Sequence, residues 1–88
     1  MKSTLEEQQA FITVVDCGSI TAAAEQLDMT VSGVSRALHR LEQKLGTTLL
    51  RRTTRRLELT EEGDTFLAHC RSILAAVEAA EETVQDRH

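Results

Sequence analysis

The sequence predicts a mainly α-helical fold: a winged helix-turn-helix (three helices plus a two-stranded wing) followed by a long helix that dimerises. Three patterns carry this prediction. Two short amphipathic segments, each preceded by a capping residue, lie a few residues apart, and the second has a polar, basic outer face. An alternating apolar and polar stretch with a basic tip comes next. The end of the chain repeats apolar residues at heptad spacing. We therefore expect a domain at residues 1–59 and a dimerisation helix at residues 60–88.

Length and composition restrict the core and the compartment. The 88 residues include two Phe and no Trp or Tyr, so the core must come from aliphatic side chains, and a second subunit that buries further apolar surface is expected. Cys17 and Cys70 form no CxxC or Cys/His pattern, so each is expected to be a small buried hydrophobe rather than a metal ligand or half of a disulfide. The chain has no signal-peptide pattern and no apolar run of membrane length, which predicts a cytoplasmic protein. It would be nucleoid-associated if the basic block at residues 36–56 binds DNA.

Charge is divided along the chain, although the formal net charge is −4. Residues 36–56 hold seven bases and one acid, whereas residues 1–35 hold one base and five acids. Residues 57–88 hold two bases and eight acids. The basic block is a candidate footprint for a polyanion, although a solvated surface laced with ion pairs would give the same count.

Residues typical of helix termini indicate where the first two predicted helices end and begin. The stretch "LEEQQAFITVVDCG" has apolar residues at three- and four-residue spacings, which predicts an amphipathic helix that stops at Gly18. Ser19 is placed to cap the next helix, "ITAAAEQLD". The small Ala residues of this second helix let another helix approach closely.

Residues 30–45, "TVSGVSRALHRLEQKL", predict the third helix, with Thr30 as its cap and Gly46 just beyond its end. Its apolar residues fall within a narrow sector: Val34, Leu38, Leu41 and Leu45. Residues that can hydrogen-bond occupy the opposite side: Ser32, Arg36, His39 and Gln43, with Ser35 and Arg40 on the flanks. A short helix followed by a second one with such a face indicates a helix-turn-helix.

Residues 50–58 predict the wing. Leu57 and Leu59 alternate with Glu58, and Leu49 and Leu50 precede a polar, basic tip. The turn is expected near Arg52, Thr53, Thr54 and Arg55. No Asn-Gly or Gly-Gly pair fixes the turn type, so the register of the two strands stays open.

The final helix begins after Thr60, a predicted cap, and the acids Glu61 and Glu62 suit the positive end of its dipole. Its heptad seam consists of Phe66, Cys70, Ile73, Val77, Ala80 and Val84. The far part of the helix has no domain left to cover it, so a second copy of the same helix is the expected partner. Packing back on its own domain is the alternative.

The polar groups of the second and third helices and of the wing predict contacts to double-stranded DNA. Arg can bond two acceptors on guanine or a phosphate, and N–H groups at helix N-termini bind phosphate. The candidate contacts are Ser19, Thr21, Thr30, Val31, Ser32, Ser35, Arg36, His39, Arg40, Arg52, Thr53 and Arg55. Solvation or an ion pair explains any single one of them equally well, so the prediction rests on their arrangement.

The stretch "GSITAAAEQLDMTVSGVSRALHRLEQKLGTTLLRRTTRRLELTEEG" resembles the N-terminal winged helix-turn-helix of LysR-type bacterial transcriptional regulators. The pattern is gapless and includes Gly18-Ser19, Ala23-Ala24, Leu27, Val34-Ser35, Leu41-Glu42, Leu45-Gly46, Leu49, Arg52, Leu59-Thr60 and Gly63. The resemblance implies that the helix at 30–45 enters the major groove of an inverted-repeat operator. It further implies that the position of Ser35 contacts the backbone, that of Arg36 bases or backbone, and that of Arg55 reaches toward the minor groove.

The resemblance also implies that the helix matching residues 60–86 pairs antiparallel with that of a second subunit, with a higher oligomer possible in a full-length protein. Such regulators continue into a domain that binds a small-molecule effector; this domain is expected to be absent here. Val31 stands where a base-reading Gln is frequent, and a Val could contact a thymine methyl instead. Ser32-Gly33 replace a frequent Pro or small-residue pair, and Leu50 replaces a common Phe.

A different class of function stays open as the alternative. A coiled-coil interaction module with a basic patch for an acidic partner would account for the heptads, but not for two capped helices followed by a basic wing. An enzyme is not predicted, because the chain has no carboxylate pair, Ser-His-Asp set or Gly-rich phosphate loop, and its three His residues are isolated. We expect no cofactor and no metal in this chain.

Overall fold

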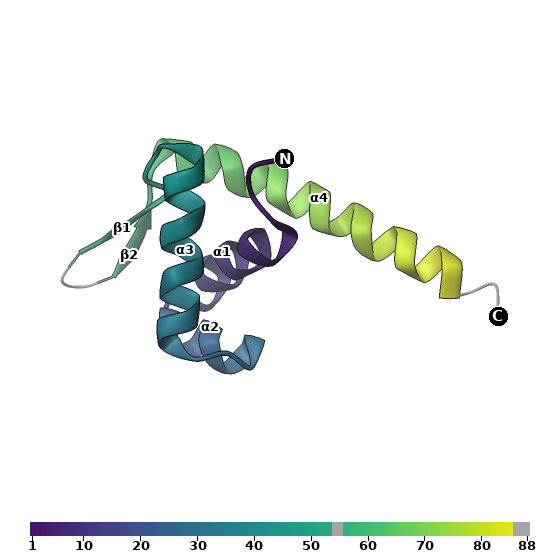
Figure 1. The fold of residues 1–88 in the computed structure, drawn as a ribbon, viewed down its shortest axis with the longest axis horizontal. Helices are drawn as coiled ribbons and strands as arrows, with labels where there is room; N and C mark the ends of the chain where they lie inside the picture. The colour runs from purple at the N-terminus through teal and green to yellow at the C-terminus, as the bar shows by residue number, and fades with distance from the viewer. Residues whose placement is uncertain (54–55, 86–88) are drawn as a thin grey trace.

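The computed structural model describes residues 1–53 and 56–85 and contains, within them, four helices and a two-stranded sheet. The elements follow in the order α1 (Leu5–Cys17), α2 (Ile20–Leu27), α3 (Val31–Leu45), β1 (Leu50–Arg52), β2 (Leu57–Leu59) and α4 (Glu61–Gln85). The first three helices pack together, the two strands project beside α3 as a wing, and α4 crosses the body and continues beyond it (Figure 1). The predicted winged helix-turn-helix with a long final helix is confirmed.

Capping residues set the helix boundaries where the sequence predicts them. The hydroxyl oxygens of Ser19 and Thr30 each accept a hydrogen bond from the backbone N–H three residues later, at 3.0 Å in both cases. Gly18 and Gly46 end α1 and α3 in the left-handed conformation, with φ of 76° and 70°. The turn between α2 and α3 begins at Asp28, which adopts φ of 55° and ends α2 one residue earlier than the sequence predicts.

The core joins the three short helices to the base of the wing and the start of α4. Its buried members are Phe11, Val14, Ala23, Ala24, Val34, Leu38, Leu41, Leu49, Leu67 and Cys70. Burial of each large aliphatic side chain contributes roughly 1.5–3 kcal/mol. Three of the four apolar residues predicted on the inner face of α3 are fully buried and Leu45 is half-buried, so the opposite side of α3 faces outward.

The wing is an antiparallel pair whose register the structure fixes. Leu50 lies opposite Leu59, and Arg52 lies opposite Leu57. The carboxylate of Glu42 on α3 accepts hydrogen bonds from the backbone N–H groups of Leu49, at 2.7 Å, and of Leu50, at 3.2 Å. These bonds fasten the start of β1 to the last turns of α3, so the base of the wing is held at a defined place beside the helix.

Helix α4 divides into a buried start and an exposed remainder. Leu67 and Cys70 belong to the domain core, whereas the later residues extend away from it and give the molecule a long dimension of 49 Å. An ion pair of 2.6 Å between Arg71 on α4 and Asp16 on α1 lies where α4 leaves the body. None of the helices in residues 1–53 and 56–85 combines the length and the apolar character that crossing a membrane requires.

Candidate nucleic-acid interface

The outer face of α3 presents polar and basic side chains to solvent. Ser32, Arg36 and His39 are exposed, and Ser35 is half-buried on the side that faces the wing. Val31, at the first position of the helix, is 48% exposed and adds an apolar side chain to this face. The buried residues on the inner side of α3 hold the helix in place, so the backbone positions from which these polar side chains extend are fixed. It has the size and donor content of a helix that enters the major groove, which is ~12 Å wide.

Arg52 of the wing contacts this face. Arg52 Nη2 donates a hydrogen bond of 3.1 Å to Ser35 Oγ, so two of the predicted DNA contacts meet although they are 17 positions apart. A cavity of about 520 Å³ lies between α3 and the wing, and Arg36, His39 and Leu57 are among the residues that line it. The outer face of α3, this cavity and the wing therefore form one continuous surface.

The N-terminal ends of α2 and α3 supply backbone donors near the same surface. In each helix the cap hydroxyl accepts the N–H of the third residue after it, and the N–H groups of the first turn have no partner within the helix. Such groups are ligands for phosphate oxygens. Thr21, in the first turn of α2, is exposed and adds a hydroxyl there.

The tip of the wing is described on both sides of its turn. The N–H of Thr53 donates to the carbonyl of Arg56 at 3.0 Å, and the N–H of Arg56 donates back to Thr53 Oγ1 at 3.1 Å. Arg56 Nε also lies 3.5 Å from a carboxylate oxygen of Glu58. Arg55, a predicted DNA contact, and Thr54 lie outside the described residues.

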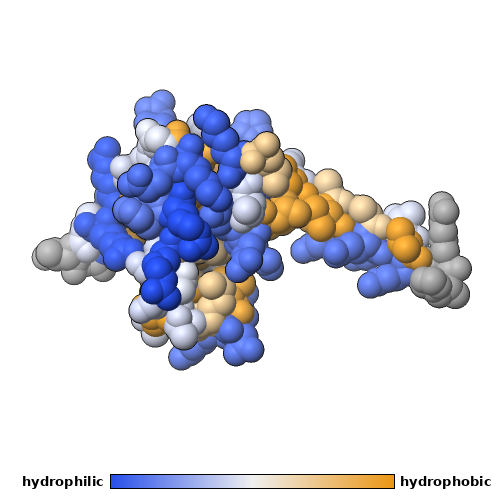
Figure 2. Space-filling model, viewed as in Figure 1, coloured by the Kyte–Doolittle hydropathy of each residue, from blue (hydrophilic) through white to orange (hydrophobic). Residues whose placement is uncertain are grey.

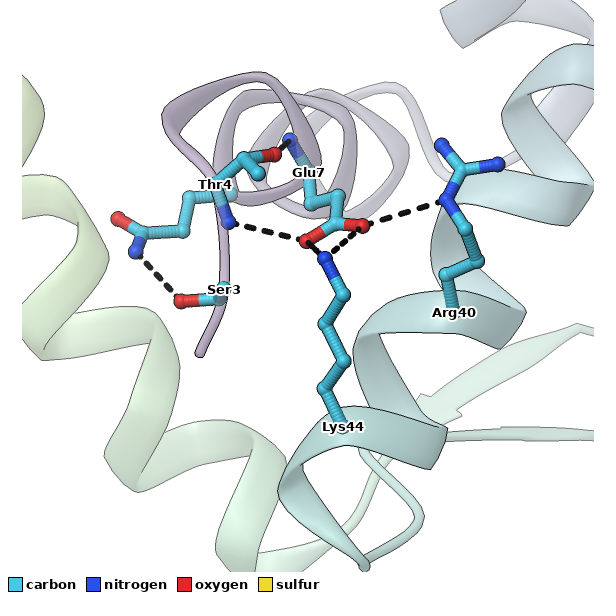
Figure 3. Close-up of polar contacts among 6 residues, drawn as sticks. Ser3, Thr4, Glu7, Arg40 and Lys44 are labelled. Atoms are coloured by element: carbon cyan, nitrogen blue, oxygen red, sulfur yellow. Dashed lines mark hydrogen bonds and ion pairs between the residues drawn. The ribbon is translucent and has the colours of Figure 1, made fainter. Parts of the chain in front are cut away.

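Arg40 lies on the flank of α3 and is set apart from the other predicted contacts. Its Nε is 3.3 Å from Oε2 of Glu7 on α1, and Nζ of Lys44 lies 2.9 Å from both oxygens of the same carboxylate (Figure 3). Burial alone raises the pKa of Glu7, but hydrogen bonds from Lys44, the Thr4 N–H and Arg40 outweigh it and hold the pKa below its usual value of 4.5. Glu7 is therefore a buried anion that binds two bases of α3.

The predicted dimer seam separates into two groups of residues. Phe66 and Cys70 pack on the body of their own domain: Cys70 has no exposed surface, and the ring of Phe66 lies 5.9 Å from that of Phe11. The side chain of Cys70 is thus already enclosed by its own domain, and its assignment to an interface between subunits stays a prediction. Burial also raises the pKa of its thiol to about 11.

The rest of the seam faces solvent in this chain. Ile73 and Val84 are 40% and 63% exposed, Ala80 is exposed and Val77 is half-buried. Figure 2 shows an apolar band along one side of α4 and hydrophilic side chains along the other. An apolar band on a helix that extends beyond its domain is typical of a surface that packs on another molecule.

Two groups at the site were not predicted from the sequence. Glu7 fits the capping-box pattern Thr4-x-x-Glu7, and the box is present, but that pattern gives no sign that Lys44 and Arg40 bind the same carboxylate. The tie between Glu42 and the start of β1 likewise has no local signal. Among the described residues, no group of three or more His, Cys, Asp or Glu side chains is placed to hold a metal ion.

Known proteins with similar sequences are bacterial transcription regulators. The sequence model of the bacterial regulatory helix-turn-helix protein, lysR family, matches residues 5–64. The chain is 52% identical over 81 residues to the HTH-type transcriptional regulator CrgA of Neisseria meningitidis, which covers 92% of this chain and 27% of that protein. It is 42% identical over 78 residues to the HTH-type transcriptional activator AaeR of Escherichia coli, covering 89% of this chain and 25% of AaeR. The chain thus spans about a quarter of the length of these regulators.

Solved structures with the same fold include complexes with DNA. The CbnR_DBD–DNA complex contains a chain that is 31% identical, with a TM-score of 0.86 and coverage of 96% of this chain and 97% of that one. The complex of BenM_DBD with catB site 1 DNA contains a chain that is 30% identical, with a TM-score of 0.90 and coverage of 94% and 93%.

Proposed function

This chain belongs to the LysR family of bacterial regulatory helix-turn-helix proteins, and on that premise we propose that it binds double-stranded DNA sequence-specifically as part of a transcriptional regulator. The observation that carries the proposal is the single surface formed by the outer face of α3 and the wing, on which Arg36, Ser35 and Arg52 lie together. We place this activity in the bacterial cytoplasm, and we assign the chain a binding role rather than a catalytic one.

The proposed binding mode places α3 in the major groove. Arg36 and Ser32 project from the exposed side of α3 toward base edges or phosphates, and Val31 is exposed at the end that enters first, where a thymine methyl is a fitting partner. Arg52, already at the edge of α3, would contact the adjacent backbone. The wing, with Thr53 and Arg55, would follow the backbone toward the minor groove.

The proposed assembly is a homodimer through α4. The exposed apolar band after Cys70 needs a partner, and a second copy of α4 in antiparallel orientation would cover it with the same band. The two α3 helices would then read an inverted repeat whose half-sites are separated by ~34 Å or a multiple of it. In a longer protein, the small-molecule effector would bind a domain beyond this chain.

Arg36→Ala tests the placement of α3. An operator is first obtained by selecting bound fragments from genomic DNA, and the affinities for operator and random duplex are then compared by fluorescence anisotropy. We expect a loss of about 1–3 kcal/mol on the operator and a lower ratio of operator to random affinity. Lys2→Ala, which removes the same charge from the exposed N-terminal segment, should leave both affinities nearly unchanged.

Two other results are informative. Equal losses on operator and random duplex would make Arg36 a phosphate contact. No loss on either duplex would contradict the placement of α3 in the groove. If the wild-type chain bound an acidic protein but neither duplex, the interaction-module alternative would replace the proposal.

A further inference from the structure

Glu7 is the one residue of α1 that binds the charged groups of α3 in the described part of the chain. Its side chain is 3% exposed, and one oxygen also accepts a hydrogen bond of 2.9 Å from the N–H of Thr4. Lys44 bonds both oxygens and Arg40 bonds the second, as Figure 3 shows. A buried carboxylate with three donors is ionised and fixed in position.

The three bases of α3 form a row that turns away from the outer face. Arg36, Arg40 and Lys44 follow one another at intervals of four residues, and each interval advances ~40° beyond a full helical turn. Arg36 is exposed on the outer face, whereas the side chains of Arg40 and Lys44 are 56% and 36% exposed and reach back to Glu7. Without Glu7, both of these bases would be free to swing toward a phosphate row.

We propose that Glu7 limits the sequence-independent, salt-dependent part of DNA binding by holding Arg40 and Lys44 against α1 and offsetting their charge. The outer face of α3 then meets DNA with Arg36 and its hydrogen-bonding neighbours instead of a row of three free bases. Because phosphate contacts carry no sequence information, withholding two of them lowers the affinities for operator and for random DNA by similar factors and makes both affinities less dependent on salt. This inference rests on the proposed function and deepens it, and it removes Arg40 from the DNA contacts predicted from the sequence.

Glu7→Gln separates this role from a purely structural one. Gln is also suited to the third position of a capping box, so α1 keeps its N-terminal bonds while the charge is lost. The control is Glu6→Gln, which makes the same charge change at the adjacent, exposed position of the same helical turn. Circular dichroism and thermal unfolding establish that each variant is folded at the temperature of the titrations.

The readout is the affinity for random duplex as a function of salt. Two freed bases that neutralise two further phosphates would make the slope of log K against log salt steeper by up to about 1.8. Glu7→Gln should therefore bind random duplex more than tenfold more tightly than wild type at 50 mM salt, and this advantage should shrink by about tenfold at 200 mM. The ratio of operator to random affinity should stay nearly unchanged, and Glu6→Gln should keep the wild-type slope.

A second variant covers the case in which Glu7→Gln does not fold. Arg40→Gln leaves Lys44 on Glu7, and it should keep the wild-type slope, because Arg40 is held away from phosphate. A slope shallower by about 0.9 would place Arg40 on a phosphate and overturn the inference. A folded Glu7→Gln that binds random duplex no more tightly than wild type would also overturn it. If the wild-type chain bound neither duplex, the proposed function itself would be refuted. This outcome is measured on the wild type only, so it is distinct from the failure of the inference about Glu7.

Discussion

At Gly63, α4 lies directly against the loop that precedes β1. This glycine is buried, and a Cβ atom built on it would collide with the carbonyl oxygen of Leu49 and lie 3.1 Å from a methyl carbon of Leu59. The backbone of Leu49 cannot move away from α4 without displacing the base of the wing. Glycine is therefore required here for close packing of a helix on a backbone, because it has no side chain.

Gly63→Ala is predicted to destabilise the domain. Ala favours a helix by about 1 kcal/mol over Gly, so local propensity alone would increase the free energy of unfolding. We expect the collision to outweigh this gain and to lower the free energy of unfolding by roughly 1–3 kcal/mol in urea denaturation. Ser72→Ala, at an exposed position of the same helix, should change it by no more than about 0.5 kcal/mol. A Gly63→Ala variant as stable as wild type would refute the close approach.

Among the elements, α3 and α4 begin with the same kind of cap in different surroundings. Thr30 is exposed, and its hydroxyl accepts one bond, from the N–H of Gly33. Thr60 is buried; its hydroxyl accepts a bond of 2.9 Å from the N–H of Gly63 and donates one of 2.6 Å to the carbonyl of Thr48. Thr60 thus starts α4 and also ties it to the segment before β1.

Replacing each cap by Ala should separate these two roles. Thr30→Ala removes one capping bond and is expected to lower the free energy of unfolding by about 1 kcal/mol. Thr60→Ala also removes the hydroxyl donor from the part-buried bond to the Thr48 carbonyl, so a larger loss of about 2 kcal/mol is expected. Chemical denaturation of the two variants beside wild type measures both values. Equal losses would mean that the bond to Thr48 contributes nothing.

At the level of elements, the sequence predicts the helices better than their contacts. An N-cap such as Ser19 and a C-terminal glycine such as Gly18 bond only to the nearest helical turn, so both can be predicted from adjacent residues in the sequence. The hydrogen bonds that Glu42 accepts help to hold the wing in its register. No Asn-Gly or Gly-Gly turn in the sequence indicates that register. The bonds of Glu7 to Lys44 and of Arg52 to Ser35 join residues 37 and 17 positions apart, and charge patterns do not specify such pairs.

The heptad seam illustrates the same limit. Cys70 and Val77 have equivalent spacing, yet one is enclosed by its own domain and the other lies beyond it. Spacing identifies the side of the helix that is covered, but it does not identify what covers it. The distinction depends on where the body of the domain ends, which is a property of the packed structure.

For the whole molecule, the direction of α4 relative to the body decides how two copies would present their α3 helices. The buried start of α4 and the Arg71–Asp16 ion pair fix this direction. Hydrogen bonds from Arg71 hold the pKa of Asp16 below its usual value. The exposed band that begins at Ile73 then extends beyond the domain, where we propose that a second copy packs.

Val77→Asp is predicted to disrupt the proposed dimer. The substitution places a charge at the middle of the exposed apolar band, where antiparallel helices would bury it without a partner. Sedimentation should show a shift from dimer to monomer, whereas Ala75→Asp, an equal change on the opposite side of α4, should leave the mass unchanged. A dimer that survives Val77→Asp would show that this band is not the interface.

The central claim is that the surface of α3 and the wing binds DNA through phosphates and reads sequence through base edges. The measurement that tests it most directly is the affinity of the wild-type chain for operator and for random duplex between 50 and 200 mM salt. The account predicts tighter binding to the operator at every salt concentration, together with a linear fall of log K of about 0.9 per phosphate contact for each unit of log salt. Affinities that do not change with salt, or that are equal for the two duplexes, would contradict it.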